Sequence, residues 1–237
     1  MNKTVRLAGI AYESLVNGPG MRRVFFAQGC KHKCEGCFNP ETHSFDDGEI
    51  MDMDKLIKDV LDNPMLKGVT FSGGDPIEQA HSFAYMAKAF KNSNLNIWCY
   101  TGYTFEKLLE VMKVDTAIRE LLNNIDVLVD GKFEIMNKKE GLKYKGSSNQ
   151  RVIDVKKSLD TGEIVVIGLV FLRILICFYK INISFSYKKQ KSACALFFIM
   201  GGWEPVYYRF YIYIIIMYLI VNFYSDKYKN SKIILSK

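Results

Sequence analysis

Three cysteines stand close together in one short loop, where thiolates could hold a metal. Cys30, Cys34 and Cys37 lie in the string GCKHKCEGC with the spacing C-x3-C-x2-C, and the next cysteine along the chain is Cys99. A structural zinc ion takes four ligands, and a cubane iron–sulfur cluster has four corners, each normally held by one thiolate. Three closely spaced thiolates therefore favour a cluster whose fourth iron stays open to a ligand from outside the protein. An open iron is a place for chemistry.

Two other interpretations of the same residues stay open at this point. His32 lies inside the loop and His43 just beyond it, so either could complete a three-cysteine zinc site. The cysteines could also be a chance cluster that forms a disulfide, because local cysteine signatures mislead when they are taken out of context.

Alternating helix and strand patterns surround the loop. A Gly/Pro turn at 17–20 precedes a strand over 23–28, which would deliver Cys30 at its carboxyl end. Further strands are predicted over 69–72, 96–100 and 126–129, and helices over 54–61, 78–91 and 104–112. Such alternation indicates an α/β protein with a parallel sheet or partial barrel.

Each predicted strand ends in a small or polar cluster. The four clusters are Gly29-Cys30, Ser72-Gly73-Gly74-Asp75, Tyr100-Thr101-Gly102 and Asp130-Gly131. Ligand sites of α/β folds lie beyond the carboxyl ends of parallel strands, and glycine lets a ligand approach the backbone closely. These clusters therefore predict one ligand site at one edge of the sheet.

At these residues the chain resembles the radical S-adenosylmethionine (SAM) enzymes. Within that superfamily it is similar to the activating proteins of anaerobic (class III) ribonucleoside-triphosphate reductases. The resemblance rests on the strings NGPGMR, FFAQGCKHKCEGCFNPETH, TFSGGDPIEQA, IWCYTGYTFEKLL, DVLVDGKFE and GSSNQRVIDVKKSL, which run in order over residues 17–159.

The resemblance implies a fold, two cofactors and a reaction. The fold would be a partial, open β/α barrel of the radical SAM type. Cys30, Cys34 and Cys37 would hold one 4Fe-4S cluster, and SAM would chelate the fourth iron. Reductive cleavage of SAM would then lead to a glycyl radical on the partner reductase, with reduced flavodoxin or a similar protein as electron donor.

The resemblance also assigns residues to SAM. Gly36, Cys37 and Phe38 would lie against it, and Gly73, Gly74 and Asp75 would receive its methionine amino group. Weaker candidates for the ribose, the carboxylate or the partner's glycine loop are Thr101, Asp130, Asn149 and Gln150. A full eight-stranded barrel needs about 250 residues, so a shorter domain would leave an open side for a loop of another protein.

Two other functions compete with this one. The chain could activate a different glycyl-radical enzyme, such as pyruvate formate-lyase, although TGYT, VDGKF and GSSNQR favour the reductase. In a different class, it could be a non-catalytic zinc-binding adaptor that uses its basic tail to hold nucleic acid or membrane.

Composition divides the chain into an activase domain, 1–167, and an atypical tail, 168–237. The first part has 22 Lys+Arg and 23 Asp+Glu, whereas the tail has 10 and 2. The net charge of +7 therefore belongs to the tail, and it predicts no nucleic-acid binding by the domain. No secretory signal opens the chain, and free thiols with an air-sensitive cluster need a reducing compartment, so we expect a cytoplasmic protein.

The tail is rich in Ile, Tyr, Phe, Lys, Leu and Ser and shows no amphipathic period. These residues have A/T-rich codons, so a shifted or read-through reading frame explains the tail best. The alternatives are a membrane anchor and a small extra domain. No membrane association is expected, because the apolar runs 169–178 and 210–221 are shorter than the ~20 residues of a spanning helix.

Overall fold

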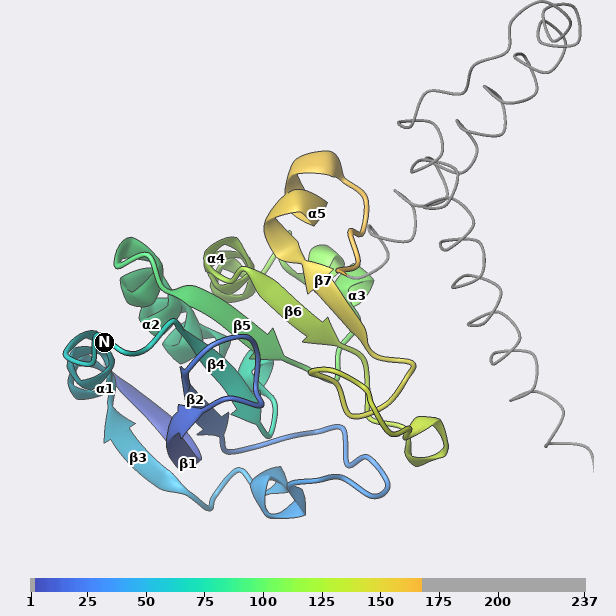
Figure 1. Ribbon diagram of the computed structural model, residues 1–237, viewed down its shortest axis with the longest axis horizontal. Coiled ribbons are helices and arrows are strands. Elements are labelled where there is room, and N and C mark those ends of the chain that lie inside the picture. Colours follow the sequence, from blue (N-terminus) through green and yellow to red (C-terminus); the bar gives the residue numbers. More distant parts are fainter. Residues whose placement is uncertain (1–2, 168–237) are drawn as a thin grey trace, which may run out of the picture. The chain divides into compact units, whose positions relative to one another are not determined.

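The computed structural model describes residues 3–167, so the expectations for the tail concern residues outside the described part. Seven strands form one sheet in the order β3-β1-β2-β4-β5-β6-β7 (Figure 1). The strands are β1 (Thr4–Ser14), β2 (Arg22–Ala27), β3 (Glu49–Asp52), β4 (Gly68–Gly73), β5 (Asn96–Tyr100), β6 (Val127–Asp130) and β7 (Arg151–Asp154).

The centre of the sheet is parallel and its margins are antiparallel. β2, β4, β5 and β6 pair in parallel, whereas β1 and β3 on one side and β7 on the other pair antiparallel. The predicted α/β class and parallel core are thus confirmed. The sheet is open, with β3 and β7 at opposite edges, and its curvature into a radical SAM barrel stays a prediction.

Residues 3–167 also form five α-helices and three short 3-10 helices. They are η1 (Pro40–His43), α1 (Met53–Leu61), η2 (Pro76–Gln79), α2 (Ala80–Asn92), α3 (Phe105–Val111), α4 (Thr116–Asn124), η3 (Ile135–Asn137) and α5 (Val155–Thr161). Side-chain caps define where most α-helices begin, since Asp52, Thr104, Asp115 and Asp154 each accept a hydrogen bond from a backbone N–H of the first turn. No helix within residues 3–167 combines the length and the apolar character that crossing a membrane requires.

Alternation along the strands separates two faces of the sheet. Val69 and Phe71 of β4 point into the main core, where Phe71 packs against Phe83 and Phe90 of α2. Trp98 of β5 belongs instead to a smaller cluster with Val127 and Val129, on the other face. Helices therefore cover one face, and the other face is left to loops and to the cavity described below.

Candidate metal and cofactor site

The cysteine loop begins directly after β2. Gly29 has φ +99°, and a Cβ there would lie 2.6 Å from the Phe45 ring, so only glycine fits this turn. The Gly29 N–H donates to the Thr42 carbonyl at 2.8 Å and the Cys30 N–H to that of His43 at 3.3 Å. The 3-10 helix η1 thus fixes the position at which Cys30 leaves the sheet.

The three sulfurs differ in their surroundings. Cys30 is buried, and burial raises the pKa of its thiol, while the backbone N–H groups of His32 and Lys33 act in the opposite direction. Cys34 and Cys37 are half-buried. The Asn39 N–H donates to Cys37 Sγ at 3.4 Å.

The described cysteines are all free thiols, which removes the disulfide interpretation for the loop. Across residues 3–167, no three His, Cys, Asp or Glu side chains converge as ligands of a single ion. His32 is bonded to Asp75, and the Nε2 atom of His43 is buried without a hydrogen-bond partner. The geometry therefore gives no support to a zinc site. Thiolates of a cubane bind different irons and need not converge on one point.

The turn after β4 lies against the cysteine loop. A Cβ on Gly74 would lie 2.5 Å from the Gly29 carbonyl oxygen, and one on Gly73, where φ is +92°, would lie 2.7 Å from the backbone of Phe26 and Ala27. Backbone N–H groups complete the contact, because Gly74 donates to Ala27 and Asp75 to Gly29. These glycines are thus required by the neighbouring strand end, whatever else they bind.

Asp75 is completely buried and its carboxylate is fully engaged. Oδ1 accepts the Ile77 N–H at 3.0 Å, which caps η2. Oδ2 contacts His32 Nε2 at 2.8 Å and accepts the Thr101 hydroxyl and the Gly102 N–H. Asp75 therefore joins three of the predicted site segments from within the protein.

A cavity of about 630 Å³ opens at the helix-free face, over the carboxyl ends of the central strands. All three loop cysteines line it, together with Phe26, Ser72 and Tyr100 from the strands. Its opposite wall is the segment 131–146, which contributes Lys138, Lys139 and Lys145. Of the described residues that line this cavity, none is an Asp or Glu. The surroundings therefore suit a ligand that carries negative charge.

The predicted site residues divide into two groups. Those that line the cavity are Cys30, Cys34, Cys37, Phe38, Gly73, Gly74, Thr101 and Gln150. Gly36, Asp75, Asp130 and Asn149 do not line it. Gly36 packs instead against Ile135, and Asn149 is exposed, with its side chain bonded to the Lys132 carbonyl.

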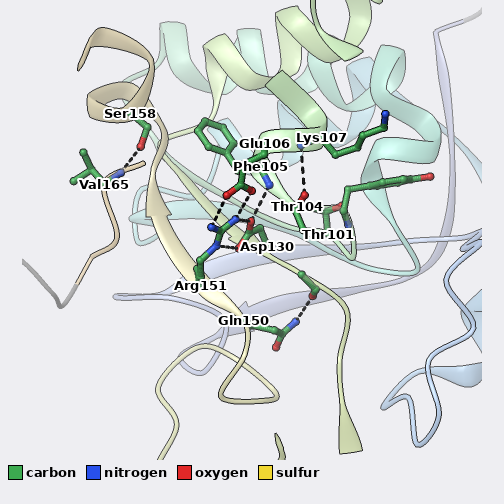
Figure 2. Close-up of polar contacts among 12 residues, drawn as sticks. Thr101, Thr104, Phe105, Glu106, Lys107, Asp130, Gln150, Arg151, Ser158 and Val165 are labelled. Atoms are coloured by element: carbon green, nitrogen blue, oxygen red, sulfur yellow. Dashed lines mark hydrogen bonds and ion pairs between the residues drawn. The ribbon is translucent and has the colours of Figure 1, made fainter. Parts of the chain in front are cut away.

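Asp130 is held by Arg151 rather than presented to the cavity (Figure 2). It also accepts the Phe105 N–H at the start of α3, 2.8 Å away. Arg151 forms two further bonds to Glu106, at 2.7 and 2.8 Å. Gln150, from the same segment, donates to the Gly131 carbonyl. It also accepts from the N–H groups of Gly146 and Ser147. This network fixes the wall of the cavity.

Sequence reasoning missed the lysines and Tyr144 of the cavity wall. Their segment holds five lysines in the fifteen residues 131–145 but no periodic pattern, so composition was the only available signal. Lys138 lies 5.0 Å from the Phe38 ring and so reaches the neighbourhood of Cys37. Lys145 donates to the carbonyls of Ser148 and Gln150.

Comparison with known proteins agrees with this arrangement. A family model described as a 4Fe-4S single cluster domain matches residues 16–153. Similar curated proteins include the anaerobic ribonucleoside-triphosphate reductase-activating proteins of Vibrio cholerae and of Enterobacteria phage T4. The former is 40% identical over 144 residues, which is 57% of this chain and 89% of the relative. The latter is 36% identical over 144 residues, 58% of this chain and 86% of the relative.

The protein of the same name from Escherichia coli K12 is 34% identical over 146 residues, covering 58% of this chain and 91% of the relative. The family model and these relatives cover the segment that carries the cysteines and the glycine turns. The chain therefore belongs to the 4Fe-4S single-cluster family, and within it to the anaerobic ribonucleoside-triphosphate reductase-activating proteins.

Proposed function

We propose that this chain is a radical SAM enzyme that activates an anaerobic ribonucleoside-triphosphate reductase by generating a glycyl radical on it. One observation carries the proposal: three free thiols and two strand-end glycines line a single cavity on the helix-free face of an α/β sheet. The names of the relatives supply the partner, and the family model supplies the cluster type.

The donor set fits one 4Fe-4S cluster. Cys30, Cys34 and Cys37 would each hold one iron, and no fourth cysteine lies in the cavity wall within residues 3–167. The cluster, when bound, supplies the electron that splits the C5′–S bond of SAM. The N–H of Asn39, which donates to Cys37 Sγ, would help to hold this ligand in place.

The chain's own residues would bind and orient SAM. Gly73 and Gly74 bring backbone close to the cavity, where carbonyl groups can accept the methionine amino group. Phe38 and Tyr100 offer apolar surface, and the lysines of segment 131–146 balance negative charge. Thr101 and Gln150 also line the cavity, although their side chains are hydrogen-bonded within the protein. Asp75 and Asp130 would act indirectly, because internal hydrogen bonds occupy their carboxylates.

Gly36 and Asn149, which lie outside the cavity lining, remain candidates for contacts with SAM or with the partner's glycine loop. Reduced flavodoxin or a similar protein would deliver the electron. The reducing conditions that such a cluster requires place the reaction in the cytoplasm. The names of the relatives do not support activation of pyruvate formate-lyase, the first alternative. The positions of the side chains within residues 3–167 do not support a zinc-binding adaptor, the second alternative.

The test is metal analysis of anaerobically purified protein, followed by reductive SAM cleavage. We expect about four iron and four sulfide per chain, and stoichiometric zinc would contradict the proposal. Cys30→Ala, Cys34→Ala and Cys37→Ala should each abolish SAM cleavage, because each thiolate holds one iron. Cys99→Ala is the matched control, since Cys99 is buried in the main core on the helix side of the sheet. SAM cleavage that persists in any of the first three variants would refute the ligand assignment.

A further inference from the structure

One histidine ties the cysteine loop to the two glycine turns. The ring of His32, midway between Cys30 and Cys34, reaches Asp75 with Nε2 at 2.8 Å from Oδ2. The His32 side chain is 8% exposed and that of Asp75 0%. The ring also packs edge-on against Tyr103, with the ring centroids 4.5 Å apart. Such a contact, away from water, holds the ring in one orientation.

The direction of the hydrogen bond follows from the other partners of Asp75. Oδ2 accepts the Gly102 N–H at 3.0 Å and the Thr101 hydroxyl at 2.9 Å. That hydroxyl is free to donate, because its oxygen already accepts the Tyr103 N–H. A carboxylate oxygen can only accept, so we assign the proton between the ring and Asp75 to His32 Nε2.

The backbone of the same residue faces the cluster ligand. The N–H groups of His32 and Lys33 are directed at the Cys30 sulfur. Lys33 has φ +48°, in the left-handed region, which costs free energy for a residue with a side chain. The loop therefore needs an anchor to keep these N–H groups in place, and the His32 ring supplies one.

Gly102 is shaped for this ring. A Cβ on Gly102 would lie 2.3 Å from His32 Cδ2 and 2.6 Å from Nε2, and the φ of Gly102 is one that alanine can adopt. A methyl group there would push the ring away from Asp75 without straining its own backbone. Gly102→Ala thus disturbs the same contact from the opposite side.

We propose that His32 is a positioning residue: by donating to Asp75 it locks the Cys30–Cys34 turn, and so holds the backbone N–H groups that face the Cys30 sulfur of the cluster. This inference rests on the proposed function only in requiring that a cluster binds. Hydrogen bonds to the sulfurs of a cluster raise its reduction potential, because they stabilise the more negative reduced form.

The first experiment compares His32→Ala with the wild type, both carrying the cluster and without SAM. The midpoint potential, followed by electron paramagnetic resonance in a redox titration, should fall in the variant. Iron release to a chelator should be about 10- to 100-fold faster, the range typical for loss of an outer-shell partner. His81→Ala removes an exposed histidine of α2 and serves as the control that should change neither quantity.

His32→Gln tests the hydrogen bond itself. Its side-chain amide can donate to Asp75 from about the position of Nε2, so it should restore most of the potential and of the iron retention. A glutamine variant that behaves as the alanine variant does would contradict a role through this bond.

A double-mutant cycle tests the same contact from the side of Gly102. Gly102→Ala should lower the potential as His32→Ala does, yet have no further effect in the His32→Ala background, where the ring is absent. Additive effects of the two substitutions would overturn the inference.

The outcomes separate this inference from the proposed function. A wild-type chain that binds no iron would refute both the proposed function and this inference. A wild-type chain with about four iron and active SAM cleavage, alongside a His32→Ala protein of unchanged potential and iron release, would remove the inference alone.

Discussion

A glycine at a strand end can be required by a bound ligand or by the packing of the protein itself. At Gly74 the structure shows the second requirement. A Cβ at this position would meet three backbone atoms, the nearest being the Gly29 oxygen at 2.5 Å. Backbone cannot give way as a flexible side chain can, so Gly29 and the adjacent Cys30 would have to move.

We therefore predict that Gly74→Ala lowers the free energy of unfolding by about 1–3 kcal/mol, the usual cost of overpacking. It should also reduce the iron bound per chain before any SAM is added. Urea titration of the metal-free protein and iron analysis of the loaded protein measure the two effects. Gly9→Ala is the control, since a Cβ there has no neighbour within 4 Å. Normal iron content in Gly74→Ala would show that the turn tolerates the shift.

Sequence spacing could single out the three cysteines because all of them lie within eight residues, and all three line the cavity, while their role as ligands stays a prediction. Sequence spacing could not predict the role of Asp75, because its carboxylate contacts His32, which lies 43 positions away in the sequence. The same holds for Asp130, which appeared as a ligand candidate at a strand end but is bonded to Arg151 and to the start of α3. Strand-end position predicts where a polar residue lies, and its partners depend on side chains from distant segments.

Among the elements, the four parallel strands and the helices α1, α2 and α3 were predicted to within two residues. Their apolar runs and the glycine turns between them are local signals. Strands β1, β3 and β7 and helices α4 and α5 were not predicted. β1 contains Gly9 and two register shifts against β2, which break the regular alternation. α4 does carry a signal in its capping residue, Asp115, followed by Ile118 and Leu121.

Arg22, the last residue of the string NGPGMR and the first of β2, has a structural role. Arg22 of NGPGMR is completely buried, and its guanidinium donates to Thr70 Oγ1 at 2.8 Å and to the carbonyls of Val69 and Asn96 at 2.6 and 2.7 Å. Burial lowers its pKa to about 10, so it stays charged at neutral pH. The charge joins the start of β2 to β4 and β5 without an ion-pair partner within residues 3–167.

Arg22→Met should lower the free energy of unfolding by about 2–4 kcal/mol, because the buried carbonyls lose donors that the charge strengthens. Arg119→Met on α4 is the comparison, since Arg119 also donates to two carbonyls but at the surface. Urea titration of both variants provides the measurement. Equal losses in the two would mean that burial of Arg22 adds nothing to stability.

Arg151 joins α3, β6 and β7, and its ion pair with Glu106 makes this junction sensitive to acid (Figure 2). Hydrogen bonds from Arg151 lower the pKa of Glu106 to about 2 from an ordinary value of 4.5. A group whose pKa is depressed by folding stabilises the native state above its unfolded pKa. That stabilisation is lost as the pH falls from about 4.5 to about 2.

Glu106→Gln should therefore cost stability at pH 7, and the difference from wild type should shrink as the pH falls below about 4.5. The Glu106 side chain is 54% exposed, so solvent screening limits the effect to about 1 kcal/mol or less. Urea midpoints of the metal-free protein at several pH values test this. Glu110→Gln removes a more weakly paired glutamate of α3 and should give a smaller difference. A difference that is constant with pH would exclude the ion pair as its cause.

At the scale of the whole molecule, the family model matches residues 16–153, and the excess of basic residues lies beyond them, in 168–237. The relatives are covered over 86–91% of their length by only 57–58% of this chain. The domain 1–167 is nearly neutral and the tail strongly basic. Within the described part, the sheet ends with residues 165–167 beside β7: Asp154 donates to Val165, and Ile167 donates to Val152 at 2.7 Å.

We predict that a chain ending after Ile167 keeps full iron content and SAM cleavage and is at least as soluble as the full chain. We expect this because the cysteine loop, the cavity lining and the hydrogen bonds to β7 all lie within residues 3–167. A chain ending after Gly162 is the matched control, because it loses the bridge that residues 165–167 form with β7 and should unfold at lower urea concentration. Fractionation with membranes tests the anchor alternative for 168–237. Partition of the full chain, but not of the shorter one, into membranes would establish an anchor, and loss of SAM cleavage on ending at Ile167 would show that the tail serves the site.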